Sequence, residues 1–125
     1  MRNLTAILVG AATILAFDTV GSLASRRFAF AYSKLTIGSF AVYLTVGFAA
    51  NAGASIVPSM FAGAAIALIE STAGWAISWK IGPGRPAENM STSRILQTVA
   101  LVTILGAVFG GVGGWLRAMQ LRGTA

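Results

Sequence analysis

Two carboxyl side chains lie inside long apolar runs of this sequence, and they are its strongest candidates for chemistry. Asp18 interrupts the run 4–24, and Glu70 is the one ionisable residue of the run 58–79. A charged residue at mid-bilayer costs about 2.5–3.5 kcal/mol on insertion scales, so such residues usually face a bundle interior. An apolar setting also disfavours the charged form of a carboxyl group. We therefore interpret Asp18 and Glu70 as binding groups for a proton or a cation.

Hydroxyl groups at matching depth are the predicted partners of these carboxyls. Counted from the basic end of each run, Tyr43 lies about level with Asp18, and Thr103 about level with Glu70. We expect two acid–hydroxyl pairs, Asp18 with Tyr43 and Glu70 with Thr103, as the transport or ion-binding candidates. In the alternative interpretation the carboxyls only hydrogen-bond between helices, at about 0.6–2 kcal/mol per bond, and Asp18 reaches water near Arg26.

Small or weakly polar residues share a helical face with each carboxyl. They lie three, four, seven or eight positions away, which is the spacing of neighbours along one face of a helix. For Asp18 they are Ala11, Gly21, Ser22 and Ser25, and for Glu70 they are Gly63, Ala67, Gly74 and Ser78. Such faces suit close contact between helices rather than contact with lipid. We expect both carboxyls to point into a bundle.

The composition predicts an integral membrane protein. Of the 125 residues, 56% are hydrophobic and 10% are charged, whereas soluble domains carry about a quarter charged residues. The mean hydropathy is +0.79, which over a whole chain indicates several spans rather than one anchor. We expect a multi-pass protein surrounded by the lipid bilayer of a cell membrane, of the bacterial inner-membrane type.

The residue inventory disfavours most enzymes. There is no cysteine or histidine, and there are three acidic residues in all. Thiolate chemistry, histidine ligands and a carboxylate metal cage are therefore not expected, and we predict no enzymatic activity, cofactor or metal site. The net charge of +6 would suit nucleic acid. The basic residues gather between apolar runs, however, so the positive-inside rule explains them better and no nucleic-acid partner is expected.

Four transmembrane helices are predicted, in a single domain over 1–125. They cover about 4–24, 35–57, 58–80 and 94–116. In an alternative assignment the second helix is shorter and ends at 50, before the turn signal of 51–53. The first run could instead be a signal peptide, although its length and its carboxyl group favour a retained helix. The fold class is therefore all-α, with four transmembrane helices arranged as two tandem helical hairpins.

The two acid-bearing runs resemble each other. When 63–80 is placed over 10–27, seven of the 18 positions are identical. Each half of the chain then holds two spans, so both halves point the same way across the membrane, as in a parallel repeat. Helices rich in alanine and glycine match one another easily, so a chance likeness is the alternative.

Three glycines recur every four residues in the last span, at Gly106, Gly110 and Gly114. This is a doubled GxxxG pattern, which lets helix backbones approach closely. We interpret it as a helix-packing face, used either within the bundle or between subunits.

Two functions of different classes are consistent with this sequence. The first is a small-solute or ion transporter or channel that uses intramembrane carboxylates. The second is a non-catalytic subunit or scaffold of a larger membrane complex. A bundle of four short helices has little interior of its own, so both imply a homo-oligomer or a larger assembly. A cavity that reaches Glu70 would favour the first, and an outward-facing glycine surface would favour the second.

The basic residues predict an orientation. The loops that follow the first and third spans hold six Lys and Arg residues, and the opposite side holds three. By the positive-inside rule we expect these two loops to be cytoplasmic and both termini to be outside, with a dual topology as the alternative.

This orientation can be tested by thiol labelling, because the chain has no cysteine of its own. We predict that a cysteine placed at Ala87 resists an impermeant thiol reagent in intact cells, while a cysteine placed at Thr124 is labelled. Labelling at Ala87 with none at Thr124 would reverse the assignment.

Overall fold

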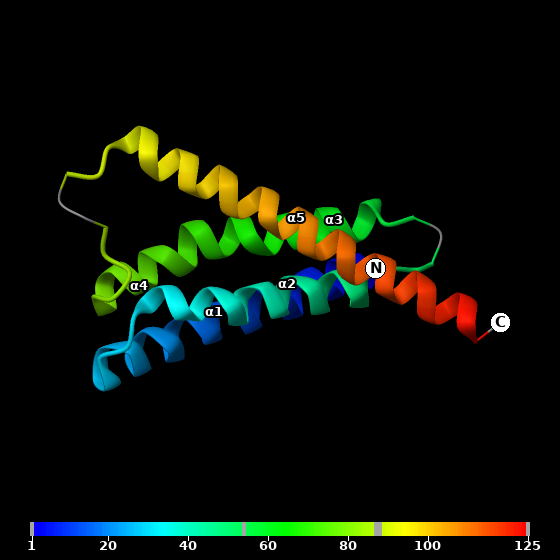
Figure 1. Ribbon diagram of the computed structural model, residues 1–125, viewed down its shortest axis with the longest axis horizontal. Coiled ribbons are helices and arrows are strands. Elements are labelled where there is room, and N and C mark those ends of the chain that lie inside the picture. Colours follow the sequence, from blue (N-terminus) through cyan, green and yellow to red (C-terminus); the bar gives the residue numbers. More distant parts are fainter. Residues whose placement is uncertain (1, 54, 87–88, 125) are drawn as a thin grey trace.

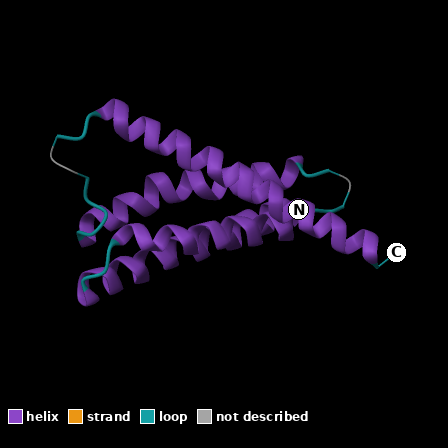
Figure 2. Ribbon diagram, viewed as in Figure 1, coloured by secondary structure: helices purple, strands orange, loops and turns teal. Residues whose placement is uncertain are grey.

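A computed structural model describes residues 2–53, 55–86 and 89–124. The elements are α1 (Arg2–Phe28), the 3-10 turn η1 (Tyr32–Leu35), α2 (Thr36–Ala50), α3 (Val57–Ile69), the π-helical turn η2 (Glu70–Gly74), α4 (Trp75–Ile81) and α5 (Thr92–Gly123). Within these described residues all regular structure is helical (Figure 2), which confirms the predicted all-α class. The labelling position Ala87 lies outside the described residues.

Four helical segments of the described chain are long and apolar enough to cross a membrane. They are Arg2–Phe28, Tyr32–Ala50, Val57–Ile81 and Thr92–Gly123. The third joins α3, η2 and α4 into one rod. The first and last are longer than their predicted spans because the helices continue through the basic residues at their ends.

The second segment ends at Ala50, so the longer predicted extent to Val57 is wrong. Asn51 leaves the helical conformation, at φ −75° and ψ 125°. Its buried side chain donates from Nδ2 to the carbonyl of Gly114 in α5, and its Oδ1 accepts from the backbone N–H of Gly53 at 2.6 Å. An asparagine that satisfies local backbone groups in this way favours a turn over a helix.

The segments run up and down, so the loops gather at two ends (Figure 1). The α1–α2 and α4–α5 connections lie at one end, and both termini lie at the other with the α2–α3 connection. α2 and α3 pack against each other and against both α1 and α5. A small apolar core forms where they meet, made of Ile14, Tyr43, Val46, Ala50, Ala62, Ile66 and Ala67. We find that α1 also packs along η2 and α4, so the two acid-bearing runs lie side by side.

The three glycines of the predicted packing face point into the bundle. Gly106, Gly110 and Gly114 are buried, and a methyl group built on any of them would overlap α3. At Gly110 that methyl carbon would lie 2.9 Å from the Cα atom of Gly63 and would collide with the backbone of Ser59. The glycines therefore allow direct backbone contact within one bundle, which is the first of the two alternatives predicted.

α5 separates from the other helices before it reaches its glycines. Its first half, which lies toward the α4–α5 connection, diverges from α4 and α2 in Figure 1. No glycine occurs in α5 between Thr92 and Leu105, so side chains keep the backbones apart there. From Gly106 onward the small face brings α5 against α2 and α3. The divergence opens space beside η2.

Substitution of a single glycine tests this close packing. We predict that Gly110→Ala destabilises the protein by about 1–3 kcal/mol, because the added methyl group overpacks a rigid backbone contact. The midpoint of thermal unfolding in detergent is the measurement. Gly123→Ala is the matched control, since a methyl group there meets nothing within 4 Å. Equal midpoints for the two variants would show that α5 does not pack in this way.

Candidate functional site

Glu70 begins a turn that the sequence pattern does not predict. The residues Glu70–Gly74 form a π-helical turn, in which the N–H of Trp75 donates to the carbonyl of Glu70 five positions back. Hydroxyls of the same turn donate to the preceding backbone, with Thr72 Oγ1 2.6 Å from the oxygen of Leu68. Single π turns inside α-helices occur frequently at functional sites. Here the turn lies inside the third membrane-length segment, at its one acidic residue.

The Glu70 side chain points into the bundle, toward α2. Its Oε1 accepts a hydrogen bond from the hydroxyl of Ser39, and its Oε2 accepts one from the phenol of Tyr43. Tyr43 is 1% exposed, so both donors hold the carboxyl group from the interior side. Bonds from hydroxyl groups to a carboxylate are stronger than bonds between neutral groups.

Asp18 faces the same point from α1. It is 1% exposed, which excludes the interpretation that it reaches water at the headgroups. Its carboxyl group lies beside the Glu70 side chain, since a methyl carbon built on Gly74 would lie 3.2 Å from Asp18 Cγ and 3.6 Å from Glu70 Cγ. A side chain at position 74 would fill the place of Asp18 Oδ2, so this glycine is what lets the two acid-bearing helices bring their carboxyls together.

The contact between the carboxyls has a direct consequence for protons. Two carboxylates provide no donor for a bond between them, and two negative charges in contact within an apolar interior repel strongly. One proton shared between them would remove most of this repulsion and would supply a donor. Asp18 Oδ2 is also buried without a hydrogen-bond partner among the described residues, so the pair has an acceptor position that its neighbours leave unused.

The predicted acid–hydroxyl pairs are wrong in their partners. Tyr43 donates to Glu70 rather than to Asp18. Thr103 does not donate to Glu70, because its hydroxyl donates to the carbonyl of Val99 in its own helix at 2.8 Å. The structure thus brings together Asp18, Tyr43 and Glu70, whereas the hydroxyl of Thr103 bonds to the backbone of its own helix.

Three serines of this site were not among the predicted candidates. Ser39 lies four residues before Tyr43 and therefore on the same face of α2, a signal that was present in the spacing. The hydroxyl of Ser22, four residues after Asp18, donates to that of Ser78, eight residues after Glu70, at 2.9 Å. Both lie on the faces that the spacing predicts to be buried, and both are fully buried.

A cavity of about 500 Å³ reaches the carboxyl groups. It lies where α5 diverges, and Arg94, Thr98, Val102 and Leu105 line it along one face of that helix. Its other walls come from α1, η1, α2, η2, α4 and the connection after α4, and they include Asp18, Ser39, Phe40, Tyr43, Glu70 and Trp75. The cavity therefore runs from the α4–α5 connection to the carboxyl groups of Asp18 and Glu70.

Removal of one hydroxyl tests the bonding at Glu70. We predict that Tyr43→Phe lowers stability by about 1–3 kcal/mol, because a buried acceptor loses its donor. Thr103→Val is the control and should stay within about 0.5 kcal/mol of the parent protein, since its hydroxyl serves only α5. Thermal unfolding in detergent compares the two. A larger loss of stability for Thr103→Val than for Tyr43→Phe would support Thr103 as the partner of Glu70, as first expected from the sequence.

Comparisons with known proteins give no information about the function of this site. The chain matches no family model, no curated protein and no solved structure. The function is therefore argued from the site itself.

Proposed function

We propose that this protein is an integral, multi-pass membrane protein that exchanges a small organic cation for protons. The observation that carries the proposal is the cavity of about 500 Å³ whose lining includes the paired carboxyls of Asp18 and Glu70. In this proposal the four apolar segments cross a cell membrane as two tandem helical hairpins. The likeness of 10–27 to 63–80 then reflects a parallel repeat whose two acidic copies meet at one site.

Protons and cations would compete for the same carboxyl pair. An ionisable group inside a membrane-spanning bundle commonly marks an ion pathway or a proton relay. With one proton shared between them, Asp18 and Glu70 carry one negative charge, which suits one monovalent cation or a second proton. Binding of the cation displaces this second proton while the shared proton stays, and this competition is the coupling that an exchanger needs.

The walls of the cavity favour an organic cation over a bare ion. Its volume lies in the range of about 300–1,000 Å³ that holds small molecules in proteins. Phe40, Tyr43 and Trp75 are among its lining residues, and aromatic faces attract cations by about 0.5–2 kcal/mol. Arg85 and Arg94 line it as well, on and beside the α4–α5 connection. The negative charge thus lies deeper than the positive charges.

A scaffold subunit is the second candidate, and the exposed side of α5 is the observation in its favour. Leu96, Leu101, Ile104 and Val108 are more than half exposed there, although lipid would cover such a face equally well. The glycines point inward rather than outward, so they supply no surface for a partner. In either function we propose a homo-oligomer or a larger assembly that shields the side on which α5 diverges.

Reconstitution tests the exchange directly. In proteoliposomes with an imposed pH gradient we predict uptake of ethidium, a monovalent aromatic cation, against its concentration gradient. Glu70→Gln abolishes the uptake, because the amide keeps the size and shape of the side chain but cannot ionise. Glu70→Asp keeps part of the activity, and Thr103→Val serves as the control with unchanged uptake.

Proton release gives a second measurement that does not need a gradient. Addition of ethidium to the purified protein in weakly buffered detergent should release protons, detected with a soluble pH indicator, and Glu70→Gln should release none. Gradient-driven uptake that is unchanged in Glu70→Gln would overturn the proposed mechanism. Absence of both binding and proton release in the parent protein would leave the scaffold role as the better function.

A further inference from the structure

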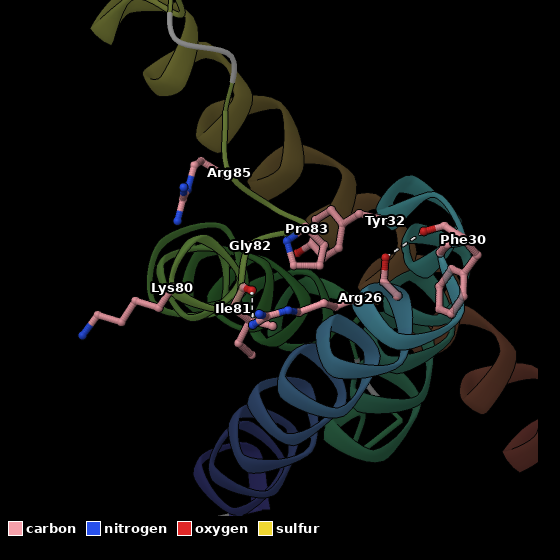
Figure 3. A pocket seen from close by; sticks show the side chains of 10 residues that line it. Arg26, Phe30, Tyr32, Lys80, Ile81, Gly82, Pro83 and Arg85 are labelled. Atoms are coloured by element: carbon pink, nitrogen blue, oxygen red, sulfur yellow. Dashed lines mark hydrogen bonds between the residues drawn. The ribbon is translucent and has the colours of Figure 1, made fainter.

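A second pocket, separate from the carboxyl groups, lies at the end of the bundle that holds the α1–α2 and α4–α5 connections. It has a volume of about 650 Å³ and lies between the end of α1 and the end of α4 (Figure 3). Arg26, Lys80 and Arg85 are among its lining residues, with the aromatic rings of Phe30 and Tyr32. Arg26 comes from α1, and the other two basic residues come from α4 and the connection after it.

The connection after α4 folds back to form this pocket. Gly82 has φ 125°, a conformation that favours glycine, and its N–H donates to the carbonyl of Ser78 at 2.8 Å. The indole N–H of Trp75 donates to the carbonyl of Gly84 at 2.6 Å. These two bonds hold the connection against α4, so the pocket is a defined part of the fold.

Basic residues line the pocket, and within the described part of the chain no acidic residue does. Asp18 and Glu70 are the acidic residues of the described chain, and neither lines it. Arg26 donates to the carbonyl of Ile81 at 3.2 Å, and Arg85 donates to that of Trp79 at 3.4 Å. These contacts place cations at the end of a helix, where its dipole favours them. Each guanidinium group has five N–H donors, and these contacts use one of them.

We propose that this pocket binds the phosphate of an anionic phospholipid headgroup. Basic pockets between membrane-spanning helices, on the side that faces anionic lipid, are suited to such headgroups. Guanidinium groups recognise phosphate oxygens in a two-pronged geometry, and Phe30 and Tyr32 suit the interfacial level where a headgroup lies. The proposal depends on the membrane location of the chain and is independent of cation exchange.

The pocket also adjoins the first cavity. Tyr32, Pro83 and Arg85 line both. A headgroup held by Arg26, Lys80 and Arg85 would therefore lie beside the opening that leads to Glu70. Its phosphate would lower the positive potential that a cation meets there.

Lipid titration measured by native mass spectrometry tests the site. The delipidated protein in neutral detergent is titrated with phosphatidylglycerol and, separately, with zwitterionic phosphatidylcholine. We expect phosphatidylglycerol to bind more tightly. The double variant Lys80→Gln/Arg85→Gln should weaken its binding by about tenfold or more, since each basic residue near a membrane surface contributes about 1 kcal/mol.

The matched control is Arg2→Gln/Arg122→Gln, which removes the same charge from the opposite end. It should bind phosphatidylglycerol as the parent protein does, and both double variants should keep the parent unfolding midpoint. Equal weakening in the two double variants would overturn the site, as would equal binding of the two lipids. Saturable binding of inorganic phosphate to lipid-free protein, without preference for phosphatidylglycerol, would assign the pocket to soluble phosphate and overturn the lipid.

Discussion

The contact between two carboxyl groups inside an apolar bundle is the constraint on which this structure depends. An isolated carboxylate is costly to bury, and two of them in contact are more so. Hydroxyl donors offset part of this cost, and one proton shared between the carboxyls would remove most of their repulsion. Ser39 and Tyr43 donate to Glu70 from α2, and Asp18 approaches from α1 over a glycine. Three helical segments must therefore keep their relative positions for the site to exist.

Glycine placement decides both where the helices touch and where they do not. Gly74 brings α1 to the carboxyl site, while Gly106 and Gly110 bring α5 against α3. The absence of glycine from the first half of α5 has the opposite effect, since ordinary side chains keep that half away. One helix thus closes the bundle at one end and leaves a cavity at the other. Tight packing and access to Glu70 come from the same element.

The charges are distributed in a way that separates two kinds of chemistry. The negative site lies inside the bundle, and the basic residues Arg26, Lys80 and Arg85 line a pocket at its end. A cation bound at the carboxyl pair and an anion bound at the basic pocket would lie on either side of Tyr32 and Arg85, which line both spaces. The π-helical turn at Glu70 lies between the part of the bundle where α5 diverges and the part where the glycines of α5 contact α3. A change of helical register at this turn would move Glu70 relative to Asp18.

The sequence by itself determined the class of the fold and the direction of its polar groups. Apolar runs of about 20 residues require helices in a bilayer. Helical spacing put Asp18 and Glu70 on small-residue faces, and those faces are buried. The inward glycines of α5 followed from the same periodicity. Each of these conclusions depends on neighbours within one helix, which a fixed helical geometry places without knowledge of the rest.

Only the tertiary structure decided which helices lie next to which. Depth along the span suggested Thr103 as the partner of Glu70, but depth does not specify the neighbouring helix, and Tyr43 on α2 holds that position. The π-helical turn and the divergence of α5 also depend on contacts between segments distant in the chain. The contact of Asp18 with Glu70 arises because α1 packs against η2. Local periodicity sets where a side chain points along its own helix, whereas close packing between helices sets what it meets.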